Sequence, residues 1–292
     1  MHRARRSKRG LILSLFSLVT LVAAVTLSVS LQRHPSQAHA AGVVVASHGH
    51  PFHLVGPKQH YLALGNSLAF GFQPNGDFTH GYVPDLFQIL QNEGTKDVKD
   101  LGCPGETSTT FINGGICSYS PFSSQLAAAV AFLKANAKKV SPVTLDIGAN
   151  DVLHDTDPRT CAVNVSGFNA DLATLDSNLT GTILPALLGA LTVKDRVTGS
   201  IVMMNYYDPL QNFCPNTVPF TQTLNQHLAA DVSGFGIIVD VFGAFGGATV
   251  PNPNICTYTW ICTPPPLGPD IHATDLGYSV IADTFAAAIP SD

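Results

Sequence analysis

The strongest constraint on the fold is a short apolar segment that ends abruptly in a serine-containing turn. Residues 61–64 are apolar and are followed by Gly65, Asn66 and Ser67. An apolar run that stops at a glycine predicts a buried strand ending in a tight turn. Ser67 would then lie at the carboxyl edge of the strand, where α/β proteins place reactive groups. A helix N-cap is the alternative explanation for a serine at this position.

Strand-like and helix-like segments alternate along most of the chain. Strands are expected at residues 61–64, 96–101, 142–147, 200–205 and 236–241. Helices are expected after Ser67 and at 81–92, 123–137, 167–191 (with a break near Pro185), 221–232 and 273–288, and residues 256–269 are expected to form a loop. This alternation predicts a three-layer α/β/α sandwich with a mostly parallel sheet.

The first forty residues are typical of an export signal. A basic segment precedes a long apolar run at residues 11–31, and Ala38-His39-Ala40 offers a cleavage site of the small-x-small type. The apolar run also reaches the roughly 20 residues needed to span a bilayer, so an uncleaved anchor is the alternative. We expect a secreted protein with a signal peptide at 1–40, a linker or N-terminal arm at 41–57 and one folded domain at 58–292.

The charge of the exported part argues against nucleic acid as a partner. Residues 1–40 hold six of the 15 Lys and Arg residues and no acid, which leaves 9 basic and 20 acidic residues after cleavage. A phosphate backbone would be repelled by this excess of negative charge. We expect a monomer that acts on small molecules, with membrane association only if the N-terminal segment is retained.

All six cysteines lie in the exported part. An even number of cysteines in an oxidising compartment predicts three disulfides. The favoured pairing is sequential, because it closes local loops: Cys103 with Cys117, Cys161 with Cys214, and Cys256 with Cys262. A Cys/His zinc site is the alternative, although the chain has no C-x-x-C motif and its histidines are scattered.

Three further motifs are expected near the strand ends that hold Ser67. They are the glycine turn around Gly105, the segment that contains Asn150, and the Asp270-Ile271-His272 segment before the last helix. A hydroxyl nucleophile, an imidazole base and neutral hydrogen-bond donors for an oxyanion are the parts of an acyl-transfer site. Together the four motifs supply these parts.

In order and spacing, the four motifs resemble those of the GDSL, or SGNH, hydrolase family over about residues 58–290. Gly-Asn-Ser-Leu at 65–68 is similar to the family's Gly-Asp-Ser-Leu block, and the segments at 102–107, 148–151 and 270–278 are similar to its other three blocks. The resemblance implies a flavodoxin-like fold, Ser67 as nucleophile and His272 as general base. It also implies an oxyanion hole made by the N–H groups of Ser67 and Gly105 and the side-chain amide of Asn150.

Two positions depart from the family's pattern. Asn66 replaces the Asp of the first block, a nearly isosteric change that we expect to be tolerated. The family often places Asp three residues before the histidine, where this chain has Pro269, and the nearest acid is Asp270. We expect Asp270 to orient His272, the alternative being a backbone carbonyl and hence a Ser-His dyad.

Other polar residues are expected to have structural roles. Asp151 would brace the Asn150 turn, and Asp275 would favour the N-terminus of the last helix. Asp146 would make a structural hydrogen bond or lie at an exposed edge, and Trp260 would pack beneath its loop. Surface or structural roles are expected for His80, His154 and His227, which have no motif around them.

The resemblance implies a secreted serine esterase or lipase that hydrolyses carboxylic esters without a metal or cofactor. Four apolar residues near the first two motifs could form an acyl site for lipid-like chains or could equally belong to the core: Phe70, Phe72, Phe111 and Ile112. Alternatives are a carbohydrate (acetyl) esterase or phospholipase of the same fold, or a catalytically inactive binding module. Retention of all four motifs argues against the inactive module, and the absence of a His/carboxylate cluster in the sequence argues against a metal-dependent hydrolase.

Overall fold

Five parallel strands form one sheet at the centre of the domain. They are β1 (His60–Gly65), β2 (Asp97–Asp100), β3 (Val140–Asp146), β8 (Ile201–Met204) and β9 (Ile237–Val239), in the spatial order β2-β1-β3-β8-β9. The computed structural model describes residues 54–291, so the expectations for residues 1–40 and for most of residues 41–57 lie outside the described residues.

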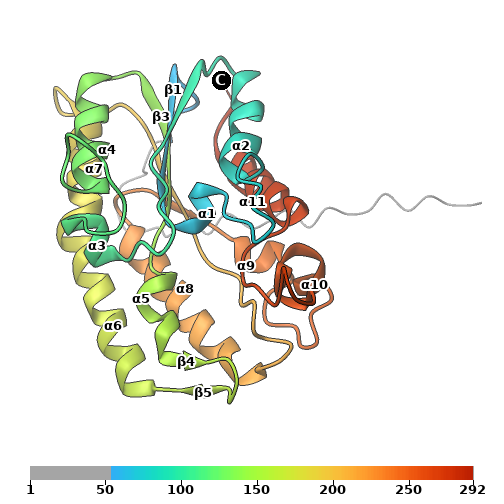
Figure 1. Ribbon diagram of the computed structural model, residues 1–292. Helices are drawn as coiled ribbons and strands as arrows, with labels where there is room; N and C mark the ends of the chain where they lie inside the picture. Colours follow the sequence, from blue (N-terminus) through green and yellow to red (C-terminus); the bar gives the residue numbers. More distant parts are fainter. Residues whose placement is uncertain (1–53, 292) are drawn as a thin grey trace, which may run out of the picture. The chain divides into compact units, whose positions relative to one another are not determined.

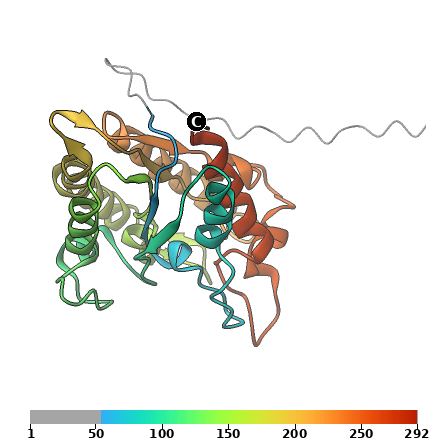
Figure 2. The same ribbon diagram turned by 90° about the horizontal axis from the view of Figure 1, so that it is seen from above.

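Helices cover both faces of this sheet. On one side α2 (Tyr82–Gln91) packs against α11 (Asp275–Ala288), and on the other α4 (Gln125–Ala135) packs against α7 (Leu184–Leu191) (Figures 1 and 2). Next to this second layer, α6 (Val165–Asn178) contacts α8 (Val218–Val232). The predicted three-layer α/β/α sandwich with a parallel sheet is therefore confirmed.

Strands β1 and β3 are covered on both faces. All seven residues of β3 are buried, as are the last five of β1. A continuous apolar run is typical of a parallel strand covered on both sides. The helices contribute one apolar stripe each, as in α2, where Leu86 and Leu90 are buried. Burying one such leucine contributes about 1.5–3 kcal/mol of transfer free energy.

The order of the strands creates a crevice between β1 and β3. From β1 the chain crosses to β2 on one side, and it then returns to β3 on the other. Connections that leave in opposite directions open a gap at the carboxyl ends of two adjacent strands, which is where open α/β sheets bind ligands. Two short helices begin there, α1 (Ser67–Phe70) after β1 and α5 (Ala149–Val152) after β3.

The structure differs from the expected elements in three places. The helix expected at 167–191 has no break, because α6 continues through the π-turn η2 (Leu179–Ile183) into α7, whose first turn tolerates Pro185. Residues 256–269 are not entirely a loop, since they include most of α10 (Ile255–Tyr258) and the 3₁₀ turn η4 (Trp260–Cys262). The remaining elements were not expected: α3 (Ser108–Asn113), α5 (Ala149–Val152), η1 (Leu153–Asp155), β4 (Thr156–Asp157), β5 (Ala162–Val163), β6 (Thr192–Val193), β7 (Arg196–Val197), η3 (Pro215–Thr217) and α9 (Val241–Ala244).

Three disulfides pair the six cysteines in the sequential order that loop closure favours. They join Cys103 to Cys117, Cys161 to Cys214, and Cys256 to Cys262. Such a set of disulfides fits an extracellular protein. Among residues 54–291, no helix combines the length and the apolar character needed to cross a membrane.

Loss of these disulfides should destabilise the domain in the order of the loops they close. The loops span 53 residues for Cys161–Cys214 and 14 residues for Cys103–Cys117. By chain entropy, replacing Cys161 and Cys214 with serines should lower the free energy of unfolding by about 4 kcal/mol. Replacing Cys103 and Cys117 with serines should lower it by about 3 kcal/mol. Urea unfolding of the two double variants beside the wild type measures both losses. Unfolding midpoints equal to that of the wild type would contradict this expectation.

Candidate active site

Ser67 begins helix α1 immediately after the central strand β1. Asn66 is the N-cap of this helix, and its Oδ1 accepts a hydrogen bond of 3.0 Å from the backbone N–H of Leu68. Gly65 has a φ of +143°, and a Cβ at this position would collide with the carboxylate of Asp146. A glycine is therefore required where the strand turns into the helix.

The carboxylate of Asp146 lies directly beneath this turn. Its side chain is completely buried and accepts hydrogen bonds from the hydroxyl of Tyr82 at 2.8 Å and from the backbone N–H groups of Asn66 at 3.3 Å and Ala69 at 3.4 Å. Burial raises the pKa of Asp146 well above its ordinary value, although these donors oppose the increase. Of the two roles considered from the sequence, the structural hydrogen bond is the one observed.

Ser67, His272 and Asp270 form a continuous chain of hydrogen bonds. Ser67 Oγ lies 2.8 Å from His272 Nε2, and His272 Nδ1 lies 2.7 Å from Asp270 Oδ1. Burial of Asp270 opposes its ionisation, but hydrogen bonds from the imidazole and the backbone N–H of His272 outweigh burial and lower the pKa of Asp270. This geometry suits proton transfer from a serine hydroxyl to an imidazole whose other nitrogen faces a carboxylate.

Several contacts fix the loop that holds His272. The carbonyl of His272 accepts a hydrogen bond of 3.0 Å from the backbone N–H of Trp260. The carbonyl of Ile271 accepts one of 3.0 Å from the hydroxyl of Tyr207. The ring of Phe72 lies 4.5 Å from the imidazole, centroid to centroid. The imidazole is therefore held from three separate segments of the chain.

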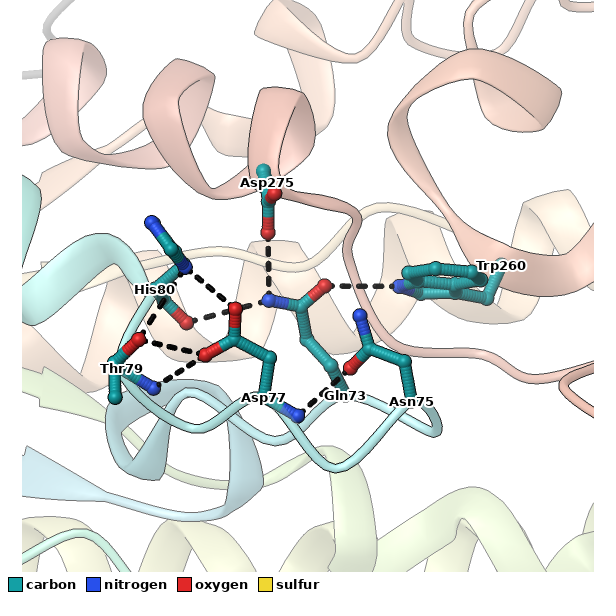
Figure 3. A network of polar contacts seen from close by, with 7 residues as sticks. All are labelled: Gln73, Asn75, Asp77, Thr79, His80, Trp260 and Asp275. Atoms are coloured by element: carbon teal, nitrogen blue, oxygen red, sulfur yellow. Dashed lines mark hydrogen bonds and ion pairs between the residues drawn. The ribbon is translucent and has the colours of Figure 1, made fainter.

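The buried amide of Gln73 connects two of these segments (Figure 3). Gln73 Nε2 donates to Asp275 Oδ1 at 2.7 Å, and Gln73 Oε1 accepts from Trp260 Nε1 at 3.2 Å. An amide is suited to this place because it faces an acceptor on one side and a donor on the other. Asp275, at the start of α11, and Trp260 thus anchor the chain next to Phe72.

The candidate oxyanion donors have unused hydrogen-bonding capacity. Gly105 follows Pro104 in a turn closed by the N–H of Glu106 and the carbonyl of Cys103 at 3.1 Å, and its φ of +84° is that of the third residue of a type II turn. Within residues 54–291, the backbone N–H groups of Ser67 and Gly105 have no partner. Asn150 Nδ2 donates to the carbonyl of Glu106 at 3.0 Å and retains a second N–H.

Asp151 connects the Asn150 segment to the glycine turn. Its carboxylate accepts hydrogen bonds from the backbone N–H of Ser108 at 2.9 and 3.1 Å and from its hydroxyl at 2.5 Å. From the sequence, Asp151 is expected to brace the turn at Asn150. In the structure its carboxylate instead binds Ser108, the first residue of α3. The two segments that carry candidate oxyanion donors are thereby held together.

A largely apolar pocket opens at Ser67, Asn150 and His272. Its wall comes from α5, η1, α6, α8 and the segment after β8, through Val152, Leu153, Phe168, Leu210, Phe220 and Leu224. None of the four apolar residues considered for an acyl site lines this pocket: Phe111 is buried in the core, Ile112 packs against it, Phe72 contacts His272, and Phe70 is partly exposed. Gly105 is likewise not part of the lining.

Asp208, a buried residue in the pocket wall, belongs to none of the sequence motifs. Its carboxylate accepts hydrogen bonds from Thr217 Oγ1 at 2.6 Å and from the backbone N–H of Leu210 at 2.9 Å. Burial raises its pKa, and these donors oppose the increase. Asp208 therefore fixes the segment after β8 against the start of α8, and its position after an apolar strand was the only available signal.

The remaining histidines each pair with an aspartate near the surface. His80 contacts Asp77, and His227 contacts Asp176 at 2.9 Å. His154 Nε2 lies 3.2 Å from Asp171 Oδ2. None of these three histidines lines the pocket.

Replacement of Gln73 by glutamate should destabilise the protein. The substitution removes the donor to Asp275 and sets a new, buried carboxylate against that of Asp275, which costs about 1–3 kcal/mol. Thermal unfolding at pH 7 should show a lower Tm for Gln73→Glu, and the difference from the wild type should shrink near pH 4, where a carboxyl can be protonated. Gln88→Glu, the same change at an exposed position of α2, is the control and should leave the Tm nearly unchanged.

Two solved structures share this fold. A lipase, Lip_vut3, from a goat rumen metagenome is 16% identical, with a TM-score of 0.53, and the match covers 79% of this chain and 97% of the lipase. The acetylxylan esterase Axe2 from Geobacillus stearothermophilus is 17% identical, with a TM-score of 0.51, and the match covers 82% of this chain and 97% of the esterase. A comparison with curated protein sequences found no match.

The sequence itself matches a family profile over most of the domain. The GDSL-like Lipase/Acylhydrolase family matches residues 63–280, which include Ser67, Gly105, Asn150, Asp270 and His272. The resemblance seen in the four sequence motifs is confirmed at the level of the family. The chain belongs to the GDSL-like Lipase/Acylhydrolase family.

Proposed function

We propose that this protein is a secreted serine hydrolase that cleaves carboxylic esters, with Ser67 as the nucleophile. The observation that carries the proposal is the hydrogen-bonded chain from Ser67 through His272 to Asp270 at the mouth of an apolar pocket. Membership of an acylhydrolase family supports ester hydrolysis as the reaction class.

In the proposed mechanism, His272 Nε2 takes the proton of Ser67 as Oγ attacks the ester carbonyl. The carbonyl oxygen becomes an oxyanion, which accepts hydrogen bonds from the N–H groups of Ser67 and Gly105 and from Asn150 Nδ2. His272 then gives the proton to the leaving alcohol, and a water molecule repeats the cycle on the acyl-enzyme. Asp270 holds the imidazole with Nδ1–H facing the carboxylate and stabilises its positive charge.

The apolar wall of the pocket favours substrates with an acyl chain longer than acetyl. Each methylene that enters such a pocket contributes up to about 0.8 kcal/mol. Val152, Phe168 and Leu224 would provide this surface. An acetylated carbohydrate is the main competing substrate class, because a solved structure with this fold is an acetylxylan esterase. Three disulfides support an extracellular location.

Replacement of Ser67 by alanine should abolish ester hydrolysis. Loss of a serine nucleophile in a triad lowers kcat by about 10⁴–10⁶-fold. The wild type and Ser67→Ala are compared on p-nitrophenyl acetate and p-nitrophenyl octanoate, and the Tm of each protein shows that the fold is intact. The apolar pocket predicts a higher kcat/KM for octanoate. Equal activity in the two proteins would refute the serine mechanism, and a strong preference for acetate would favour the carbohydrate esterase.

Replacement of Asp270 by asparagine tests whether the carboxylate or a backbone carbonyl orients His272. A carboxylate with this role predicts a loss in kcat of up to about 10⁴-fold. Asp283→Asn, at an exposed position of α11, is the control for the same chemical change. A loss of less than tenfold in Asp270→Asn would indicate a Ser-His dyad.

The kcat/KM of the wild type should decrease on the acid side of its pH profile, and His272 is the group responsible. The lowered pKa of Asp270 keeps this carboxylate ionised above the ordinary aspartate value of about 3.9. Protonated His272 cannot accept the serine proton, so hydrolysis requires the neutral imidazole. The stability that Asp270 contributes is lost only at lower pH. We therefore expect kcat/KM to decrease from pH 8 to pH 5, and a flat profile over this range would contradict His272 as the base.

A further inference from the structure

A second cluster of titratable side chains lies behind the wall of the pocket. His154, Asp155 and Asp171 each present one ligand atom, and these atoms all lie within 4.8 Å of one another. Within residues 54–291, this is the only group of three such side chains that converges in this way. Ligands of one ion bonded at about 2.0–2.2 Å are separated by distances of this order.

Asp155 is the unusual member of this cluster. Its side chain is only 5% exposed, and although Oδ1 accepts a hydrogen bond of 3.0 Å from Asn164 Nδ2, Oδ2 has no hydrogen-bond partner in the described part of the chain. A buried carboxylate oxygen without a partner is costly. It therefore needs a proton or a cation that the protein does not itself supply.

The carboxyl group of Asp171 faces that of Asp155. On the outer side, Asp171 Oδ2 lies 3.2 Å from His154 Nε2. Two facing carboxylates and a neighbouring imidazole are a donor set that attracts a divalent cation, since the ion offsets the repulsion between the two negative charges.

The cluster is connected to the pocket through the chain on both sides. Leu153 and Thr156, which flank His154 and Asp155, line the pocket, as does Phe168, three residues before Asp171 on α6. An ion held by residues from η1 and from α6 would join these two elements. It would therefore fix one part of the pocket wall without touching the reacting atoms.

We propose that His154, Asp155 and Asp171 bind one divalent cation of the zinc type, which clamps η1 to α6 behind the pocket. One imidazole and two carboxylates match the nitrogen and oxygen ligands that Zn²⁺ accepts, whereas Ca²⁺ and Mg²⁺ prefer oxygen ligands alone. The role of the ion is structural, so this site lies beyond the proposed esterase activity.

A neighbouring trio of the same composition provides the control. His227 pairs with Asp176 at 2.9 Å, and burial followed by the charge of Asp176 raises the pKa of Asp231 to about 7. The ligand atoms of this trio do not converge as those of the first cluster do. It should therefore hold a proton rather than a metal ion.

Titration of the purified, tag-free protein with zinc chloride tests the proposal. The protein is first treated with EDTA and dialysed, and binding is followed by calorimetry at pH 7.5. The six cysteines are in disulfides and do not compete as ligands. We expect the His154→Gln/Asp171→Asn variant to lose one equivalent of zinc, and each single variant to bind that equivalent at least tenfold more weakly. The His227→Gln/Asp176→Asn variant should bind as the wild type does.

Thermal unfolding provides a second readout. Zinc should raise the Tm of the wild type and of the His227→Gln/Asp176→Asn variant but should raise that of His154→Gln/Asp171→Asn less. Calcium or magnesium at the same concentration should not reproduce the effect. The proposal is overturned if no equivalent is lost in His154→Gln/Asp171→Asn, if both double variants lose it equally, or if calcium replaces zinc. The exposed His154 and the half-buried Asp171 are changed rather than the buried Asp155, so that failure to fold does not obscure the result.

Discussion

The buried carboxylate of Asp146 is the contact on which the arrangement of the site depends. It ends β3, yet its partners are the hydroxyl of Tyr82 on α2 and the backbone N–H groups of Asn66 and Ala69 around the turn after β1. The two strands that border the crevice are thereby joined at their carboxyl ends. Burial raises the pKa of this group, so the hydrogen bonds must offset a considerable cost of desolvation. The same carboxylate leaves room only for a glycine at position 65.

Disulfides tie several of the loops near the crevice, which have little regular structure of their own. The Cys103–Cys117 disulfide begins two residues before Gly105, and Cys256–Cys262 encloses Trp260, whose backbone N–H binds the carbonyl of His272. The third disulfide, Cys161–Cys214, joins the residue before β5 to the segment before α8. Other residues of that segment line the pocket. Loops are ordinarily the least stable parts of a domain. Here the covalent links hold the candidate site residues on a rigid frame.

The sequence predicted what depends on local patterns and missed what depends on distant contacts. The parallel sheet and the place of Ser67 could be predicted, because apolar runs ending in particular motifs mark strand ends regardless of what packs beside them. The grouping of His272 with Ser67 was implied by the resemblance of the four motifs to a family. The pocket wall could not, since Phe168 and Leu224 look like ordinary core residues until α6 and α8 are placed side by side. Gln73 likewise has no signal in the sequence, because its partners lie roughly 190 and 200 residues further along the chain.

The position of Asp270 shows how a departure from a family pattern can be accommodated by local geometry. An aspartate readily accepts a hydrogen bond from the backbone N–H two residues later, and Asp270 Oδ1 accepts one of 2.9 Å from the N–H of His272. The same oxygen lies 2.7 Å from His272 Nδ1. A spacing of two therefore places the carboxylate beside both the backbone and the ring of one residue, without help from a more distant acid. Because one short turn fixes the carboxylate and the imidazole together, the loop needs only to be anchored at Trp260 and Tyr207 for the imidazole to face Ser67.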